Sequence, residues 1–191
     1  GAFTPSTDRN VISPDPPFRT PITKAVPGIQ VQGRFADDPT GEARFLLRFP
    51  SDWNGSLVVA GASGTRSEFN GDFAWSDYVL QKGYAYASQN KGVLNFRLVG
   101  VSVAPPASDP LACRLNPSSP VWVHFYDLYP AKPFTEWQGR IVEAVALARA
   151  GVKARYGRSP RWTYAVGTSN GGYQVRRAIE DVSDVVPHSV V

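Results

Sequence analysis

The sequence of 191 residues has no methionine, two histidines and a single cysteine, Cys113. A disulfide within the chain is therefore excluded, and so is a metal site made of several cysteines. We expect a buried or half-buried free thiol at Cys113, because any bridge that it forms needs another chain. The first residue is Gly1 and not methionine, so we expect that a signal peptide, pro-segment or tag has been removed.

Long apolar runs and dense charge are also absent. The longest apolar stretch, Ala144 to Ala148, lies between Glu143 and Arg149, far short of the roughly 18 residues that a membrane span needs. Charged residues make up 19% of the chain and hydrophobic residues 42%, a balance typical of a single globular domain and not of a disordered chain. The net charge of +4 is spread along the sequence, so we expect neither a nucleic-acid nor a membrane partner.

The chain divides into an arm and a domain. Residues 1–28 contain six prolines and predict an extended arm without chemistry, because proline removes backbone donors and fixes φ. In the domain, 29–191, apolar and polar residues alternate over 29–35 and again over 43–49. The turn-forming residues Asp37 to Gly41 separate the two runs, which predicts an antiparallel hairpin.

Strand and helix patterns alternate after this hairpin. Parallel strands joined by helical crossovers follow from such an order, so the sequence predicts an α/β fold with a mostly parallel sheet covered on both faces. We expect the sheet to be incomplete in this chain, because the last helix has no strand after it. The expected elements are strands at 56–60, 84–88 and 162–166 and helices at 72–81, 135–156 and 173–182, the first two helices ending at Gly83 and Gly157.

Residues 91–133 interrupt this alternation with seven prolines and a group of aromatic residues. Long irregular segments within a domain are commonly lids or binding loops. We therefore assign substrate contacts to Trp122, His124 and Tyr126, with ordinary packing as the alternative for each.

The strongest functional motif is Gly167-Thr168-Ser169-Asn170-Gly171, which matches Gly-x-Ser-x-Gly. It stands between a predicted strand and a predicted helix, the context in which this pattern forms a nucleophile elbow. The elbow holds a serine hydroxyl above the edge of a sheet, so we predict that Ser169 is the nucleophile. The N–H of Asn170, at the start of the helix, is then placed to stabilise an oxyanion.

A second glycine-rich segment, Gly61 to Thr65, follows the apolar strand 56–60. We expect a second oxyanion donor here, the N–H of Ala62 or Ser63; the alternative is a connecting loop with no partner. Neither glycine-rich segment has the lysine of a phosphate-binding loop, and the two histidines lie far apart in the sequence. We therefore expect no nucleotide, no metal and no cofactor.

Two segments carry a resemblance to a known family. Thr163 to Gly172, together with Gly83 to Gly92, resembles the α/β-hydrolase superfamily over residues 29–191, and more narrowly esterases of the tannase and feruloyl esterase type and 3-hydroxybutyrate oligomer hydrolases. The resemblance implies a Ser-His-Asp triad, an acyl-serine intermediate and a small-molecule or oligomeric ester substrate. It also implies a secreted or periplasmic protein.

The chain departs from the family at the other two members of the triad. In this fold the acid and the histidine follow the nucleophile, but only 22 residues come after Ser169. His188 follows the elbow helix too closely to serve as the base, and we assign no catalytic role to Asp181 or Asp184. We expect the acid and the base on a second polypeptide from the same precursor, which would complete a heterodimer; a fragment is the alternative.

Two other functions stay open. The same nucleophile could cleave an amide or peptide bond, because both reactions need a nucleophile, a base and an oxyanion hole. A hydrolase fold that has lost catalysis and serves as a binding protein is the third possibility.

Overall fold

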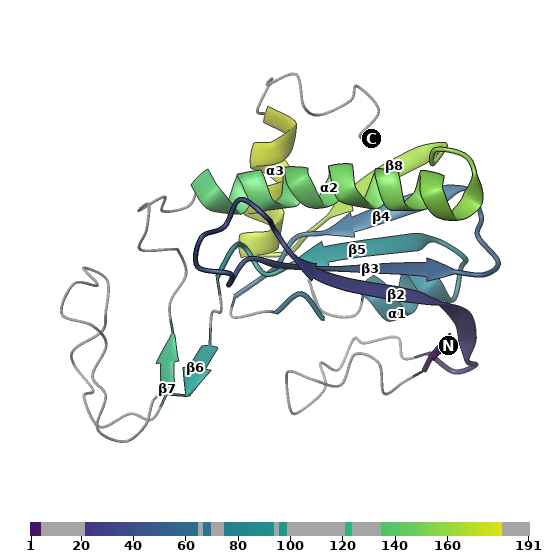
Figure 1. The fold of residues 1–191 in the computed structure, drawn as a ribbon, viewed down its shortest axis with the longest axis horizontal. Coiled ribbons are helices and arrows are strands. Elements are labelled where there is room, and N and C mark those ends of the chain that lie inside the picture. Colours follow the sequence, from purple (N-terminus) through teal and green to yellow (C-terminus); the bar gives the residue numbers. More distant parts are fainter. Residues whose placement is uncertain are drawn as a thin grey trace.

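The computed structural model describes residues 1–4, 22–64, 67–69, 75–93, 96–98, 121–123 and 135–180. Six strands form one sheet in the order β1-β2-β3-β5-β4-β8, and β6 pairs with β7 separately (Figure 1). In chain order the elements are β1 (Ala2–Phe3), β2 (Val26–Arg34), β3 (Arg44–Pro50), β4 (Ser56–Ala60), α1 (Trp75–Leu80), β5 (Ala85–Gln89), β6 (Phe96–Leu98), β7 (Val121–Val123), α2 (Thr135–Tyr156), β8 (Trp162–Val166) and α3 (Asn170–Glu180).

One half of the main sheet is antiparallel. The predicted hairpin is confirmed, with Ile29 opposite Phe49 across β2 and β3. Its turn is closed by Asp38, whose carboxylate accepts hydrogen bonds from the N–H groups of Thr40 at 2.9 Å and Ala43 at 2.7 Å. An aspartate that caps nearby backbone donors in this way fixes a turn, and through it the register of the strands on either side.

The other half of the sheet is parallel. β4 lies between β5 and β8, and Ala60 pairs with Ser88 on one side and with Val166 on the other. All five residues of β4 are buried, as the continuous apolar run predicts. Because the three strands run the same way, their carboxyl ends meet at one edge of the sheet, here called the carboxyl edge.

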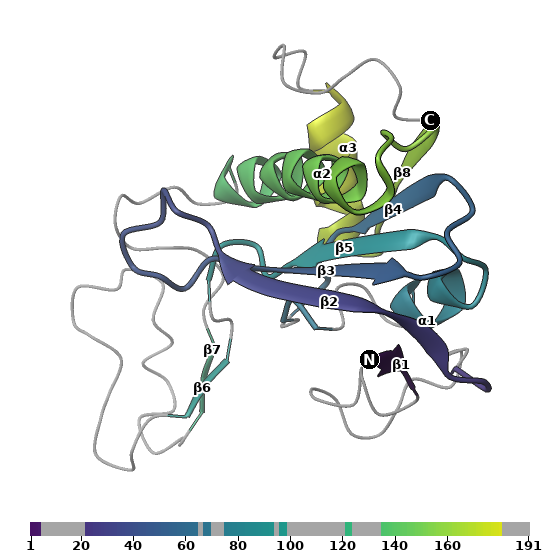
Figure 2. The ribbon, with the colours of Figure 1, turned by 45° about the vertical axis from the view of Figure 1, so that its right-hand side comes forward.

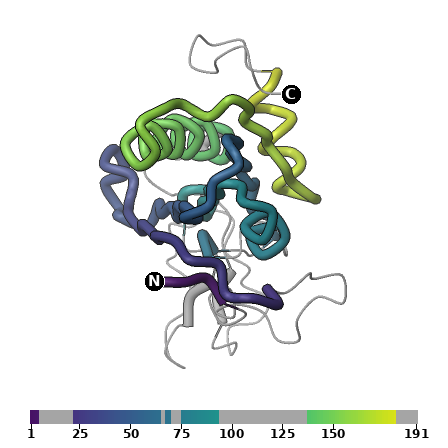
Figure 3. The backbone as a smooth tube through the Cα atoms, turned by 90° about the vertical axis from the view of Figure 1, so that its right-hand side faces the viewer, coloured from purple at the N-terminus to yellow at the C-terminus, as the bar shows by residue number. Residues whose placement is uncertain are grey.

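Helices cover both faces of the sheet. Figures 2 and 3 show α2 and α3 on one face and α1 on the other. Under α2 lies an apolar cluster, in which Ile141, Ala144, Ala148 and Val152 pack against Leu57, Val59 and Ala87. On the opposite face Val79 and Leu80 of α1 pack with Val58, Ala60 and Tyr86, and Phe3 and Ile22 of the N-terminal arm join them. The α/β class is thereby confirmed, with a mixed sheet.

Two helix ends follow the sequence prediction closely. Gly83, after α1, has a φ of 78°, and Gly157, after α2, has a φ of 71°. The N–H of Gly157 donates to the carbonyl of Lys153 at 2.9 Å. A residue in the left-handed region is a common helix terminator, and glycine adopts it without a steric penalty.

Several strand ends shift by one residue, and two boundaries differ from the prediction by three residues. Helix α3 begins at Asn170 and not at residue 173, because the Tyr173 N–H donates to the Ser169 carbonyl at 3.0 Å and closes the first helical turn ahead of the expected start. Strand β2 begins at Val26, inside the proline-rich arm, and Pro27 pairs with Ala2 of the edge strand β1. Pro27 lies at the start of β2, before its pairing with β3 begins at Gly28, and proline is tolerated at a strand start.

Within residues 91–133 the structure places β6 and β7 as an antiparallel pair. Apart from these two strands, residues 91–93 belong to the described part of the chain, and the rest of this predicted binding segment lies outside it. No helix among the described residues is long and apolar enough to cross a membrane.

Candidate active site

The predicted nucleophile lies on a tight turn between β8 and α3. β8 ends at Val166, α3 begins at Asn170, and the Gly171 N–H donates to the Thr168 carbonyl at 2.8 Å. Ser169 is exposed in the described structure and has a φ of 52°. An L-residue seldom adopts this left-handed conformation, because its Cβ approaches the backbone. Ser169 thus has the strained backbone that a nucleophile elbow requires.

Only one other non-glycine residue of the described chain has a positive φ. It is Lys91, which has a φ of 67° and lies two residues after the end of β5. Both strained residues therefore follow strands whose carboxyl ends meet at the carboxyl edge. Backbone strain of this kind costs of the order of 1–3 kcal/mol and is concentrated at functional sites.

Glycines allow three backbone segments to meet beneath the elbow. A Cβ at Gly167 would lie 2.3 Å from the Gly171 carbonyl carbon, and a Cβ at Gly61 would lie 2.5 Å from the Gly171 oxygen. Neither position can hold a side chain without a backbone shift. The first glycine of the motif and the first glycine after β4 are thus needed for the close contact of both segments with the Gly171 backbone.

The loop after β4, residues Gly61–Gly64, is here called the β4 loop. The Gly61 N–H donates to the Val166 carbonyl at 2.8 Å, so the loop leaves the sheet beside the elbow. Ala62 and Ser63 are buried. The Ala62 N–H donates to Gln174 Oε1 at 2.7 Å, and it would have to give up this bond to act as an oxyanion donor.

Asn170 supplies the other predicted donor. It is the first residue of α3, where backbone N–H groups have no partner within the helix and the helix dipole favours negative charge. Among the described residues no hydrogen bond is found for the Asn170 N–H. The arrangement at this helix end can therefore receive an oxyanion formed next to Ser169.

Sequence reasoning missed a buried polar pair beneath this site. Gln174 of α3 and Gln89 of β5 are both fully buried, and their amides exchange hydrogen bonds of 3.2 and 3.3 Å. Gln174 also donates to the Trp137 carbonyl at 2.7 Å. The sequence held two signals for this pair. Gln174 comes one helical turn after Asn170, on the side of α3 that faces the sheet, and Gln89 stands at the end of an apolar strand.

A buried carboxyl group follows the β4 loop. Glu68 is 6% exposed, and burial raises its pKa above the usual range, although a backbone hydrogen bond and the Arg44 guanidinium act in the opposite direction. The Ser88 hydroxyl donates to the Glu68 carbonyl oxygen, which ties this segment to the end of β5.

Comparison with known proteins identifies the fold. No protein-family model and no curated protein matches the sequence. Solved structures with a similar backbone include tannin acyl hydrolase from Aspergillus niger, with a TM-score of 0.54, 17% identity and coverage of 97% of this chain and 30% of that one. They also include feruloyl esterase B from Aspergillus oryzae, with a TM-score of 0.50, 14% identity and coverage of 87% of this chain and 28% of that one. The chain has the α/β-hydrolase fold. It spans less than a third of either similar structure. The similarity in fold confirms the resemblance predicted from the two sequence motifs.

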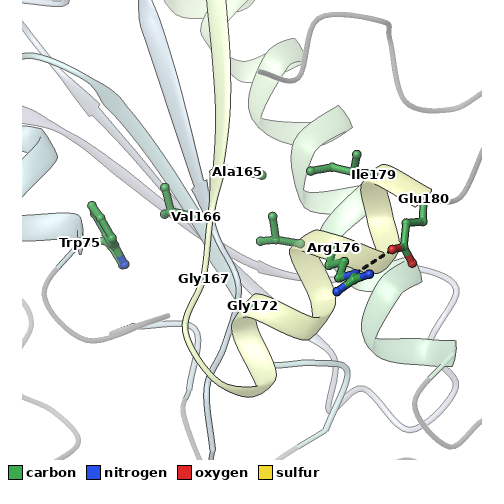
Figure 4. Close-up of a pocket in the computed structure, with 9 residues that line it drawn as sticks. Trp75, Ala165, Val166, Gly167, Gly172, Arg176, Ile179 and Glu180 are labelled. Carbon is green, nitrogen blue, oxygen red and sulfur yellow. Dashed lines mark hydrogen bonds and ion pairs between the residues drawn. The ribbon is translucent and has the colours of Figure 1, made fainter.

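A pocket lies beside the elbow of this hydrolase fold, between β8 and α3, with a volume of about 540 Å³. Gly167 and Gly172 form its end nearest the elbow, and Arg176 and Glu180, paired at 2.7 Å, border it along α3 (Figure 4). The remaining walls are apolar: Trp75, Ala165, Val166, Val175 and Ile179.

The described structure does not place the side chains of the other predicted site residues. Trp122 belongs to β7, and only its backbone is described. No group of three or more potential metal ligands occurs among the described residues. The remaining residues considered above lie outside the described part of the chain: His124, Tyr126, Cys113, Asp181, Asp184 and His188.

Proposed function

We propose that this chain supplies the nucleophile of a serine hydrolase that cleaves carboxylic esters. The observation that carries the proposal is the conformation of Ser169: an exposed serine with a φ of 52° on the turn that joins a parallel strand to a helix. A role as nucleophile accounts for this backbone strain, because the hydroxyl must then lie above the carboxyl edge next to the helix N-terminus. The similarity in fold to two esterases supports the ester class.

In the proposed reaction the Ser169 oxygen attacks the carbonyl carbon of the ester while a base takes the hydroxyl proton. The N–H groups of Asn170 and Ser63 stabilise the negative oxygen of the tetrahedral intermediate. The C–O bond to the alcohol breaks and the base returns the proton to the leaving alcohol, which leaves an acyl-serine. Water then attacks the acyl group, releases the acid and restores the Ser169 hydroxyl.

We place the acid and the base on a second polypeptide from the same precursor, docked at β8. Two features support this position. β8 is the outermost strand on the parallel side of the described sheet, and an edge strand presents backbone groups that can pair with another strand. Beside it, the pocket between β8 and α3 has apolar walls, and Ile179 is 57% exposed.

The nucleophile is tested by labelling the complete native protein, with any chain that purifies with it, using a fluorophosphonate probe. We expect the probe on Ser169, and we expect Ser169→Ala to abolish both labelling and ester hydrolysis while the protein stays folded. Ser159→Ala, at an exposed loop serine, is the matched control and should label normally. Matched ester and anilide substrates separate esterase from amidase activity. An unlabelled Ser169 would turn the assignment toward a binding protein.

The second polypeptide is tested by intact-mass analysis of the native material under denaturing conditions, with and without reductant. We expect a second chain that contains a histidine and an acidic residue, and a mass that merges without reductant would identify a partner for Cys113. A single chain of 20.8 kDa would refute the heterodimer. We further propose a secreted or periplasmic location, which cell fractionation tests.

A further inference from the structure

Lys91 is a fully buried lysine at the carboxyl edge. Its ammonium nitrogen donates to the carbonyl of Ala62 at 3.1 Å and to the carbonyl of Gly64, and it lies 5.5 Å from the centre of the Trp137 ring. Lysine is almost never fully buried, because its charge loses hydration. The strained φ of Lys91 adds a second local cost. Lys91 thus carries two energetic costs, and its ammonium group binds two carbonyl groups of the β4 loop.

Ala62 is held from two directions. Its carbonyl accepts from Lys91, and its N–H donates to Gln174 of the elbow helix at 2.7 Å. Gln174 is in turn fixed by Gln89 and by the Trp137 carbonyl. The loop that holds one predicted oxyanion donor is therefore joined by hydrogen bonds to the helix that holds the other.

The peptide bond between Ala62 and Ser63 transmits this restraint. In a trans peptide the carbonyl of one residue and the N–H of the next point in opposite directions. With the Ala62 carbonyl fixed on Lys91, the Ser63 N–H is directed away from Lys91. The positive charge also polarises this amide, which makes the Ser63 N–H a stronger donor.

We propose that Lys91 and Gln174 are positioning residues for the oxyanion hole, which hold and polarise the Ala62–Ser63 peptide before the substrate binds. This inference rests on the proposed function of Ser169. It accounts for three features found around the β4 loop: a buried lysine, the strained φ of that lysine and a buried pair of glutamines.

The test uses Lys91→Met and Gln174→Met in the complete native protein. Each variant removes one of the two restraints on Ala62 while it keeps a side chain of similar length. We expect fluorophosphonate labelling of Ser169 to slow by about tenfold to a hundredfold in both, somewhat less than the loss of a whole oxyanion donor. Lys82→Met, at an exposed lysine after α1, is the matched control and should label at the wild-type rate.

A second measurement separates positioning from folding. For each variant kcat/KM is compared between p-nitrophenyl acetate and its thiono analogue, in which sulfur replaces the carbonyl oxygen. A misdirected oxyanion donor lowers the preference for the oxygen ester, whereas a partly unfolded sample keeps the wild-type preference in its folded fraction. If Lys91→Met does not fold, Gln174→Met carries the same expectation with the lysine in place.

The outcomes distinguish the two proposals. A wild-type protein that is not labelled at Ser169 refutes the proposed function and this inference with it. A labelled wild type whose Lys91 and Gln174 variants react at its own rate and keep its ester preference refutes the inference alone.

Discussion

The core under α2 and the carboxyl edge of the same sheet are built in different ways. Under α2, buried aliphatic residues such as Leu57 and Ile141 pack against one another. This packing stabilises the fold because it removes apolar surface from water. At the carboxyl edge the buried side chains include Gln89, Lys91 and Gln174, and two residues have strained backbones. Burial of apolar area thus sets where the helix and the sheet lie, whereas the polar contacts and the strain set where single backbone groups point.

The largest effect should come from the closest backbone contact at the carboxyl edge. Gly167→Ala would place a Cβ 2.3 Å from the Gly171 carbonyl carbon, and because backbone must move to relieve it we expect a loss of about 3 kcal/mol or more in the free energy of unfolding. Labelling of Ser169 should be lost as well. Urea unfolding and the labelling assay measure the two effects.

The control for this substitution is Gly139→Ala. Gly139 is exposed on α2, and nothing lies within 4 Å of a Cβ there, so alanine should stabilise the helix by about 0.5–1 kcal/mol. If both substitutions had similar effects, the close contact beneath the elbow would not exist.

A truncation in the apolar core should lower stability and leave the chemistry unchanged. Ile141 is 1% exposed and packs in the cluster under α2, so Ile141→Ala should cost about 2–5 kcal/mol through lost burial and a residual cavity. The rate of Ser169 labelling, corrected for the folded fraction, should stay at the wild-type value. A slower rate in the folded protein would mean that the core and the edge are coupled, against the comparison drawn above.

Removal of strain should have a smaller effect of opposite sign. Ser169→Gly replaces a residue at a φ of 52° by one that adopts this conformation freely, and the relief of about 1 kcal/mol exceeds or balances the entropy that glycine adds to the unfolded chain. The variant should be inactive and at least as stable as wild type by thermal unfolding. Ser159→Gly, at a loop serine without positive φ, should lose stability, and equal losses at both sites would argue against strain at the elbow.

The difference between the apolar core under α2 and the carboxyl edge also explains which features the sequence can predict. Apolar periodicity located α2 with its bounds at Thr135 and Tyr156 and located the buried strand β4, because burial leaves a pattern in neighbouring residues. The Gly-x-Ser-x-Gly motif located Ser169 on the turn after β8, because the turn needs glycines at fixed positions.

Contacts between distant segments leave no such local pattern. Ala62 and Gln174 are 112 positions apart, and nothing in the sequence near either residue announces the other. The start of α3 was misplaced by three residues for a related reason. Gly171 and Gly172 are poor helix formers by propensity, yet they lie in the first turn of α3, where the Gly171 backbone is in close contact with Gly61 and Gly167.

The smallest effects concern two buried carboxyl groups, one in the hairpin turn and one at the carboxyl edge, and their pH dependences should have opposite signs. Burial raises the pKa of Asp38, but the hydrogen bonds from Ala43 and Thr40 outweigh it and lower the pKa overall. For Glu68 burial prevails and raises the pKa. Ionised Asp38 therefore stabilises the fold above the ordinary value of 3.8, and this contribution is lost as the pH falls through its lowered pKa. Ionised Glu68 is destabilising at neutral pH, and the cost is relieved as the pH falls through its raised pKa, above 4.5.

Substitution of each carboxyl by its amide isolates these contributions. Relative to wild type, Asp38→Asn should be less stable at pH 7 and should approach the wild-type stability in acid, whereas Glu68→Gln should be more stable at pH 7 and should lose that advantage in acid. Urea unfolding between pH 7 and about pH 3 measures both differences. Parallel pH profiles for the two variants would contradict the distinction between a hydrogen-bonded turn, which holds its carboxylate ionised, and a carboxyl edge that buries ionisable groups at a cost in stability.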